Sequence, residues 1–360
     1  MQFSFTEDQA MIRATASALV GRTWSSEAAR AFALGDDAPA AALWHDLAAA
    51  GFCGVLVPEA RGGSGLSMVE AGIVLEALGS ALAPVSFLAT AVAAADTIAR
   101  LGNEEQKARW QPRIAAGKVA ATVVGWQQPA RVEADGGLRG RWAPVPCAPD
   151  ADLLVVCAQE NGGETAVYLV ETQAVPGAVA DFPTMDRTRR QGVVVLEGAR
   201  GERLATPLTP AGEERLRAVL LAGSAAEAAG GAARVLEMET RYACERIQFG
   251  RPIGTFQAIK HMLADQLVAI EGLRSLVWAA LWSIDQAPDE ALLAAVAARA
   301  TADRVALQSA AENIQVHGGS GFTQDIDAHL YVKRAQADRL AWGPPALHSK
   351  YLESRLKELA

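Results

Sequence analysis

The chain of 360 residues is too long for one typical domain, and its 51% of hydrophobic residues suffices for more than one packed core. A charged fraction of 21% argues against a disordered chain, and a net charge of −8 with scattered basic residues gives no electrostatic reason to expect binding to nucleic acid. Abundant alanine with only 6% aromatic residues favours closely packed helices.

The expected compartment follows from the start of the chain, its apolar runs and its cysteines. Residues 1–8 have neither the basic nor the apolar region of a secretory leader, so we expect a cytoplasmic protein. Asp96 and Glu227 interrupt the apolar runs that approach membrane-spanning length, so we expect no membrane contact. The cysteines lie far apart in apolar or helical contexts, which predicts buried, reduced thiols at Cys53, Cys147, Cys157 and Cys244.

Residues 1–117 are predicted to form an N-terminal helical domain. Thr6 is a natural N-cap, and Glu7 and Asp8 in the first turn complement the helix dipole. A glycine-rich break at residues 61–65 interrupts the helices, and a long apolar helix is predicted to begin near Ser67.

Residues 118–207 are predicted to form a middle antiparallel β-domain. Short β-prone runs occur at residues 119–124, 153–156, 166–170 and 192–196, separated by Gly, Pro and Asp. No helical pattern lies between them, which argues against βαβ units, and no GxGxxG follows a strand.

Residues 208–360 are predicted to form a C-terminal helical bundle. Apolar residues at helical spacing define one face of a helix, and Pro288 begins the next helix. That apolar face comprises Phe256, Ile259, Leu263, Leu267 and Ile270. The predicted fold class is therefore α+β and mostly α, with a helical, a β and a second helical part.

Two segments of the C-terminal part carry groups suited to a nucleotide cofactor. Within residues 241–257, Arg246 offers a guanidinium fork that suits a pyrophosphate, and Phe249 offers a flat apolar face. Gln248 and Gln257 supply amide donors and acceptors. In the segment Gln315–Val316–His317–Gly318–Gly319, the paired glycines expose backbone N–H groups that can bind an anion.

These two segments, in this order behind a β-domain, resemble the acyl-CoA dehydrogenase family. The first is similar to its Tyr-x-x-x-Arg-x-x-Phe-Gly element, and the second to its Gln-x-x-Gly-Gly-x-Gly-Phe turn. The resemblance implies the family's three-part fold, FAD as cofactor, an acyl-CoA substrate and an electron-transfer flavoprotein as acceptor. It also implies that seven residues contact FAD, partly across a subunit interface: Arg246, Gln248, Phe249, Gln257, Gln315, Gly318 and Gly319.

The chain departs from the family at the catalytic base. Most relatives carry a Glu after an aromatic residue beyond the Gly-Gly turn, but here Gly343 follows Trp342. Relatives that place the base on an earlier helix would have it at Leu220, which is equally inert. A gap in the alignment would leave Glu213, Glu214 or Glu227 as candidates, and Glu227 lies in an apolar helix where burial would raise the pKa of its carboxyl. The alternative for Glu227 is a structural carboxylate bound to a neighbour.

A second departure concerns a loop that touches the flavin ring and acyl-CoA in relatives. Residues 125–131 stand where the family has Thr-Glu-Pro-x-x-Gly-Ser-Asp, and they lack the Gly-Ser-Asp. The family includes heteromeric members in which one chain type has lost these features. The sequence therefore predicts a base-lacking, FAD-binding subunit that pairs with a homologous subunit carrying the Glu.

Two other functions remain open from the sequence. One is a self-sufficient homo-oligomeric dehydrogenase that uses another base such as Glu227, and the other is a flavin-free binding or scaffold protein. A metal site is not expected, because His317, His329 and His348 have no paired ligand at i+4.

Overall fold

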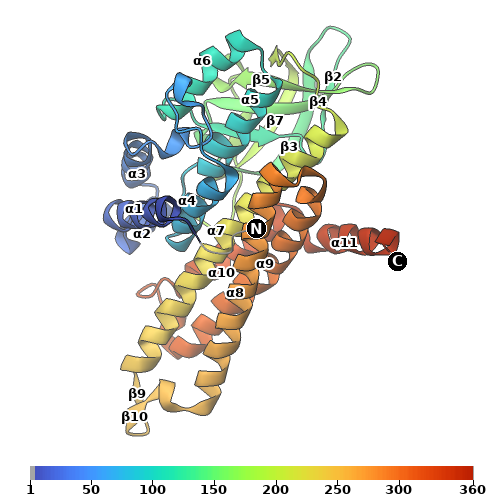
Figure 1. The fold of residues 1–360 in the computed structure, drawn as a ribbon. Coiled ribbons are helices and arrows are strands. Elements are labelled where there is room, and N and C mark those ends of the chain that lie inside the picture. Colours follow the sequence, from blue (N-terminus) through green and yellow to red (C-terminus); the bar gives the residue numbers. More distant parts are fainter. Residues whose placement is uncertain (1–4, 360) are drawn as a thin grey trace.

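The computed structural model of the chain describes residues 5–359 and has three parts, as Figure 1 shows. Short helices of the N-terminal part and an eight-stranded sheet lie at one end, and long helices of the C-terminal part extend away from them. The predicted fold class, with its helical, β and helical order, is confirmed.

The N-terminal helices begin where the sequence places their caps. The Thr6 side chain accepts from the backbone N–H of Gln9 to start α1, and the Ser67 side chain accepts from that of Val69 to start α4. The helices of this part are α1 (Glu7–Thr23), α2 (Ser26–Ala33), α3 (Ala38–Ala49), η1 (Phe52–Gly54), η2 (Glu59–Arg61), α4 (Met68–Ser80), η3 (Leu88–Ala94), α5 (Ala95–Leu101) and α6 (Glu104–Ala115).

The central sheet has the strand order β6-β7-β3-β2-β4-β5-β8, with β1 paired to β4 off this path. Its strands are β1 (Ala121–Val124), β2 (Ala130–Val132), β3 (Leu138–Pro146), β4 (Leu153–Gln159), β5 (Thr165–Glu171), β6 (Val179–Asp181), β7 (Gln191–Ala199) and β8 (Glu202–Arg203). Most pairs are antiparallel as predicted, but both β1 and β2 run parallel to β4. The difference arises because β3 and the turn η4 (Ala148–Asp150) return the chain to the start of β1 before β4 begins.

Strands β1 and β2 lie one after the other along β4, as two pieces of one interrupted strand. Residues 121–124 pair with 153–156, and residues 130–131 pair with 158–159. The interruption begins at Gly125, whose φ of 81° suits glycine and where an added Cβ would lie 2.4 Å from the Cys157 carbonyl oxygen. The segment 125–129 therefore leaves the sheet and carries Trp126 and Gln127 towards the C-terminal helices.

The C-terminal part is built on three long helices that run alternately up and down (Figure 1). Its elements are α7 (Pro210–Glu245), β9 (Ile247–Gln248), β10 (Arg251–Pro252), η6 (Ile253–Thr255), α8 (Gln257–Gln286), α9 (Pro288–His317), η7 (Gly318–Phe322), α10 (Ala328–Ala341) and α11 (Pro345–Leu359). Helix α7 crosses α4 at very short range. An added Cβ at Gly79 or Gly230 would lie within 2.0 Å of a backbone atom of the other helix.

Two long apolar helices differ in how far the protomer buries them. By length and composition alone, α7 and α8 could each cross a membrane; 72% of the apolar window of α7 is buried in the protein, against 39% for α8. The predicted apolar face of α8 is only partly covered, since Ile270 is buried while Leu267 is 49% exposed. Its remaining apolar surface faces outwards from the protomer.

The cysteines follow the prediction except at one position. Cys53, Cys147 and Cys157 are buried free thiols, and burial raises the pKa of Cys53 and of Cys157 to about 12. Cys244 is exposed instead of buried, because it lies at the end of α7 beyond the packed part of the bundle.

Candidate functional site

The two motifs predicted to bind a cofactor meet at the end of the bundle that lies farthest from the sheet. The first motif forms the hairpin between α7 and α8, with β9 and β10 at its tip (Figure 1). The second forms η7, directly after α9. Tyr242 near the end of α7 lies on His317 at the end of α9, with ring centroids 4.3 Å apart and an interplanar angle of 30°. This contact ties the two motifs together.

All residues predicted to contact the cofactor are exposed in the protomer: Arg246, Gln248, Phe249, Gln257, Gln315, Gly318 and Gly319. Among the described residues, the Arg246 guanidinium has no hydrogen-bond or ion-pair partner. Phe249 is 91% exposed at a positive φ of 50°, and Gly250 continues the turn at a φ of 77°. An unpaired cation, a flat apolar ring and amide groups on one exposed turn fit the pyrophosphate and adenosine of a flavin dinucleotide.

Glu227 lies in a buried charge cluster between the sheet and the bundle. Its carboxylate accepts from Arg189 at 2.5 Å, and the same guanidinium donates to Asp338 at 3.1 Å. All three side chains are at most 5% exposed. A carboxylate engaged in such a pair anchors the segment before β7 to α7 and α10, and this geometry supports the structural role over that of a free base.

The two positions that the family resemblance assigns to a catalytic base, Leu220 and Gly343, contain no titratable group. Leu220 is 1% exposed on α7. Gly343 follows α10 with a φ of 101°, where an added Cβ would lie 3.0 Å from Gln127 Nε2 and 3.3 Å from His348 Nε2. These distances are shorter than ordinary van der Waals contact, so a side chain at this position would require Gln127 or His348 to shift.

A cavity of about 250 Å³ lies between the interrupted strand, the start of α7 and the junction of α10 with α11. Of the acidic residues considered from the sequence, Glu213 lines it, whereas Glu227 does not. The lining residues are Gly125, Trp126, Gln127, Pro129, Cys157, Thr165, Leu208, Glu213, Leu216, Arg217, Leu221, Trp342, Leu347 and His348.

Buried charged side chains lie behind this cavity at positions that no sequence motif predicts as site residues. His348 Nδ1 lies 3.4 Å from Asp303 Oδ2, and Arg299 donates to the other oxygen of Asp303 at 2.5 Å. All three side chains are at most 4% exposed. Burial acts to raise the pKa of the Asp303 carboxyl, but His348 and Arg299 together hold this pKa below its ordinary value. Only the Arg299–Asp303 pair, at i,i+4 on α9, carries a signal in the sequence.

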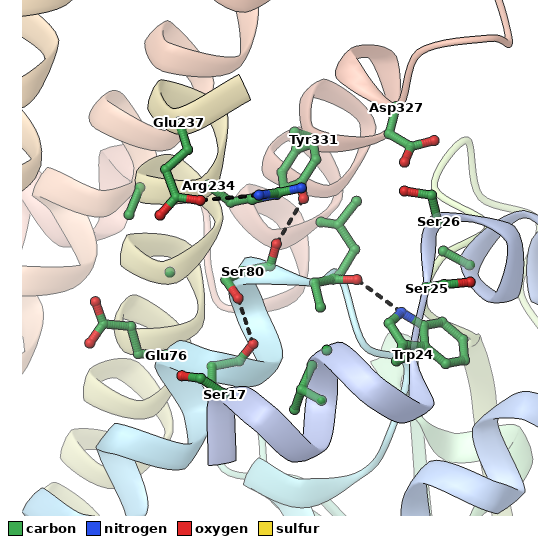
Figure 2. Close-up of a pocket in the computed structure, with 18 of the residues that line it drawn as sticks. Ser17, Trp24, Ser25, Ser26, Glu76, Ser80, Arg234, Glu237, Asp327 and Tyr331 are labelled. Atoms are coloured by element: carbon green, nitrogen blue, oxygen red, sulfur yellow. Dashed lines mark hydrogen bonds and ion pairs between the residues drawn. The ribbon is translucent and has the colours of Figure 1, made fainter. Parts of the chain in front are cut away.

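A larger crevice, of about 510 Å³, opens between α1, α4, α7 and α10 (Figure 2). Tyr331 donates to the Ser80 carbonyl at 2.7 Å, and Trp24 donates to the Ala81 carbonyl at 2.9 Å. Arg234 pairs with Glu237 at 3.1 Å at its edge. The residues that line this crevice include none of those predicted to bind a cofactor or to act as a base.

Comparison with known families matches both helical parts of the chain. A model of the N-terminal domain of acyl-CoA dehydrogenases matches residues 6–118, and a model of their C-terminal domain matches residues 221–356.

Individual relatives match over nearly the whole length. The chain is 33% identical over 354 residues to the acyl-CoA dehydrogenase IpdE2 of Mycobacterium tuberculosis, covering 98% of each protein. It is similar to the ChsE4–ChsE5 complex from the same organism, with a TM-score of 0.90, 29% identity and 99% of each chain covered. An acyl-CoA dehydrogenase of Bacillus anthracis, solved with FAD, shares the fold with a TM-score of 0.85 at 20% identity, over 99% of this chain and 67% of that one.

Proposed function

Since this chain belongs to the acyl-CoA dehydrogenase family, we propose that it is the base-lacking subunit of a heteromeric, FAD-dependent acyl-CoA dehydrogenase. Its partner is a homologous chain that carries the catalytic Glu. The observation that carries this proposal is the pair of inert positions, Gly343 and Leu220, where relatives place the base. The ChsE4–ChsE5 relative, a complex of two chain types, supports the heteromeric arrangement.

The described residues would hold FAD through the hairpin tip and the Gly-Gly turn. Arg246 would pair with the pyrophosphate, Phe249 would lie against a ring, and the N–H groups at Gly318 and Gly319 would donate to oxygen. When bound, FAD supplies the oxidant that takes a hydride from the β-carbon of the acyl group. The exposure of all these residues in the protomer supports contact with a flavin held by a second subunit. An electron-transfer flavoprotein is the proposed acceptor.

Co-expression with a homologue that has the intact Glu tests the proposal. We expect dye reduction by a panel of acyl-CoAs from the complex, and none above background from this chain alone. Activity of the chain alone would favour the self-sufficient enzyme, and the variants Glu213→Gln and Glu227→Gln would then identify the base.

The flavin contact has its own test. Arg246→Ala removes a charge-assisted hydrogen bond, which should weaken flavin affinity by on the order of 2 kcal/mol. Arg304→Gln, a change at an exposed arginine on α9, serves as the control. Unchanged flavin content in folded, assembled Arg246→Ala would remove the support for this site. A complex that never contains flavin would favour the scaffold function.

A further inference from the structure

A small polar cavity of about 150 Å³ lies where α6 meets the sheet. This junction is at the opposite end of the molecule from the β9–β10 hairpin (Figure 1). The walls of the cavity come from α6 and the segment after it, from the residue before β4, and from the end of β5 with the turn that follows. Apart from Val119 and the ring of Trp110, the lining side chains are polar or charged, which suits a small polar ligand.

Trp110 brings a buried hydrogen-bond donor to this cavity. Its side chain is 1% exposed, and its Nε1 has no acceptor within the described part of the chain. An indole N–H can only donate, and a buried donor without an acceptor is costly. The cavity therefore favours a ligand that brings an oxygen atom.

Two unpaired cations line the same cavity. Arg113 is half-buried, with its guanidinium carbon 4.7 Å from the centroid of the Trp110 ring. Lys118 is exposed, and its backbone N–H donates to the Arg113 carbonyl at 2.9 Å, so the two residues are neighbours. Neither side chain makes a hydrogen bond or an ion pair with another described residue. A guanidinium and an ammonium group beside an unpaired N–H suit an oxyanion.

The two acidic residues of the cavity differ in how far their oxygens are engaged. Both oxygens of Glu171 accept hydrogen bonds, from Arg109 at 2.5 Å and from Gln173 at 2.9 Å. Asp152 accepts from the backbone N–H of Ala120 at 2.9 Å through Oδ2, whereas its Oδ1 has no donor among the residues described. Glu171 is thus neutralised by Arg109, and Asp152 retains one oxygen that can accept from a ligand.

A free carboxylate oxygen beside several donors discriminates between oxyanions. Hydrogen phosphate has a P–OH group that can donate to a carboxylate while its remaining oxygens accept hydrogen bonds. Sulfate has no proton at neutral pH, so the same carboxylate repels it. The volume of about 150 Å³ is also below the roughly 300 Å³ of typical small-molecule pockets, which limits the ligand to a group of about this size.

We propose that this cavity binds free hydrogen phosphate. Trp110, Arg113 and Lys118 donate hydrogen bonds to the phosphate oxygens, and the phosphate hydroxyl donates to Asp152. The bound anion links α6 of the N-terminal part to the ends of β4 and β5, so it stabilises the junction of the helices with the sheet.

The test uses the purified full chain at pH 7.5 and constant ionic strength, with inorganic phosphate as the probe followed by phosphorus NMR. We expect saturable binding of phosphate, and competition by sulfate should give a Kd at least about tenfold weaker, because sulfate cannot donate to Asp152. Equal affinity for the two anions, or no saturable binding of phosphate, would overturn the proposal.

Glycerol 3-phosphate distinguishes free phosphate from the phosphate group of a larger molecule. The second pKa of a phosphate monoester is about 6, so at pH 7.5 most of the ester has no P–OH. It should therefore bind more weakly than inorganic phosphate. Tighter binding of the ester would show that free phosphate is not the preferred ligand.

Three variants locate the site. Arg113→Gln should weaken phosphate binding by about tenfold or more, whereas Arg304→Gln, at an exposed arginine on α9, should leave it unchanged. Trp110→Phe keeps an aromatic ring without the donor and should weaken binding by about fivefold. Asp152→Asn should bring the affinities for phosphate and sulfate to within about threefold of each other. Equal phosphate affinity in Arg113→Gln and Arg304→Gln would place the anion elsewhere and refute the assignment.

Thermal unfolding separates lost binding from lost folding. Phosphate should raise the Tm of the wild type above that in chloride of the same ionic strength, and this increment should shrink in Arg113→Gln and Trp110→Phe even if their Tm in chloride is lower. An undiminished increment in both variants would contradict the site. None of these measurements needs flavin or a partner subunit, so the phosphate site and the proposed function fail independently.

Discussion

Glu239 is an acidic side chain fully enclosed in the C-terminal bundle. Neither carboxylate oxygen makes a hydrogen bond of regular geometry, and the side chain is 0% exposed on α7. Burial raises the pKa of Glu239 to about 8, with the charge of Glu312 adding to the increase and the amide of Gln266 opposing it. The group is therefore protonated at neutral pH and loses its proton only in mild alkali.

Replacing Glu239 by Gln should stabilise the protein most at high pH. The folded pKa of about 8 lies above the ordinary 4.5, so the folded state binds the proton more tightly and stability falls as pH rises from about 4.5 to 8. The amide of Glu239→Gln does not titrate, so this variant avoids the loss of stability. Above pH 8 its free energy of unfolding should exceed that of the wild type by an amount that approaches about 5 kcal/mol. Urea unfolding at pH 5.5 and 8.5 measures it. Exposed Glu245→Gln is the control, and parallel pH profiles for wild type and Glu239→Gln would contradict the assignment.

Glu227 should reveal a structural role by the same kind of measurement. Glu227→Gln leaves the buried Arg189 with Asp338 as its one remaining carboxylate, so we expect a loss of about 3 kcal/mol in the free energy of unfolding. Exposed Glu214→Gln on the same helix should change it by less than about 0.5 kcal/mol. Equal stability of the two variants, with turnover lost in Glu227→Gln alone, would identify a base instead.

At the scale of elements, the crossing of α4 and α7 depends on paired glycines. An added Cβ at Gly79 would lie 2.0 Å from the Glu227 carbonyl oxygen, and one at Gly230 would lie 1.9 Å from that of Glu76. The two helices thus meet backbone to backbone, close to where Glu227 reaches the charge cluster. The helices can approach this closely because Gly79 and Gly230 have no side chains at the crossing.

Gly230→Ala should therefore separate the helices, whereas Gly272→Ala should not. We expect Gly230→Ala to lower the free energy of unfolding by about 2 kcal/mol or more, because the methyl group must displace backbone. Gly272 on α8 has nothing within 4 Å of its added Cβ, so the same change there should stabilise the helix by up to about 1 kcal/mol. Denaturant unfolding compares the pair, and equal effects would refute the account.

Local signals explain which elements the sequence predicts correctly. Thr6 and Ser67 cap their helices through contacts within three residues, and the β-branched runs coincide with strands. The parallel pairing of β1 with β4 depends on how the chain between residues 124 and 153 returns to the start of β1. The alternation of apolar and polar residues and the turn residues therefore do not predict this pairing.

Partners of buried charges are likewise set by packing. Glu227 pairs with Arg189, which lies 38 residues away in the sequence. The residues around either position contain no pattern that predicts this ion pair. Asp303 and His348 meet only because α11 turns back onto α9. The predicted cofactor residues do occupy one end of the bundle, because the hairpin and η7 end helices that pack along their length. Their contact with FAD remains a prediction.

At the scale of the whole molecule, α8 presents apolar surface that the protomer leaves uncovered. Leu267 is 49%, Val268 74% and Leu276 36% exposed on this helix. Neighbouring exposed apolar side chains on one helix are typical of a subunit interface. The same protomer exposes its predicted flavin contacts, so assembly and cofactor binding are expected to depend on each other.

Val268→Asp should weaken the assembly. A carboxylate buried at the interface would cost several kcal/mol, so light scattering should show a smaller particle and flavin content should fall with it. Met11→Asp places the same charge on an exposed apolar position of α1, 63% exposed against 74% for Val268, and should leave the mass unchanged. An unaltered mass for Val268→Asp would show that α8 faces solvent in the complex.

The interrupted strand has a consequence for how such a protein diversifies. Because β4 holds β1 on one side of residues 125–129 and β2 on the other, the short segment is clamped at both ends by ladder hydrogen bonds. Its composition can therefore change, or a homologue's loop can be transplanted, without shifting the register of the sheet. The fold therefore accommodates sequence changes in the segment that lines the cavity of about 250 Å³. After gene duplication, one copy could lose a catalytic activity at this cavity while its sheet and helices still folded and assembled.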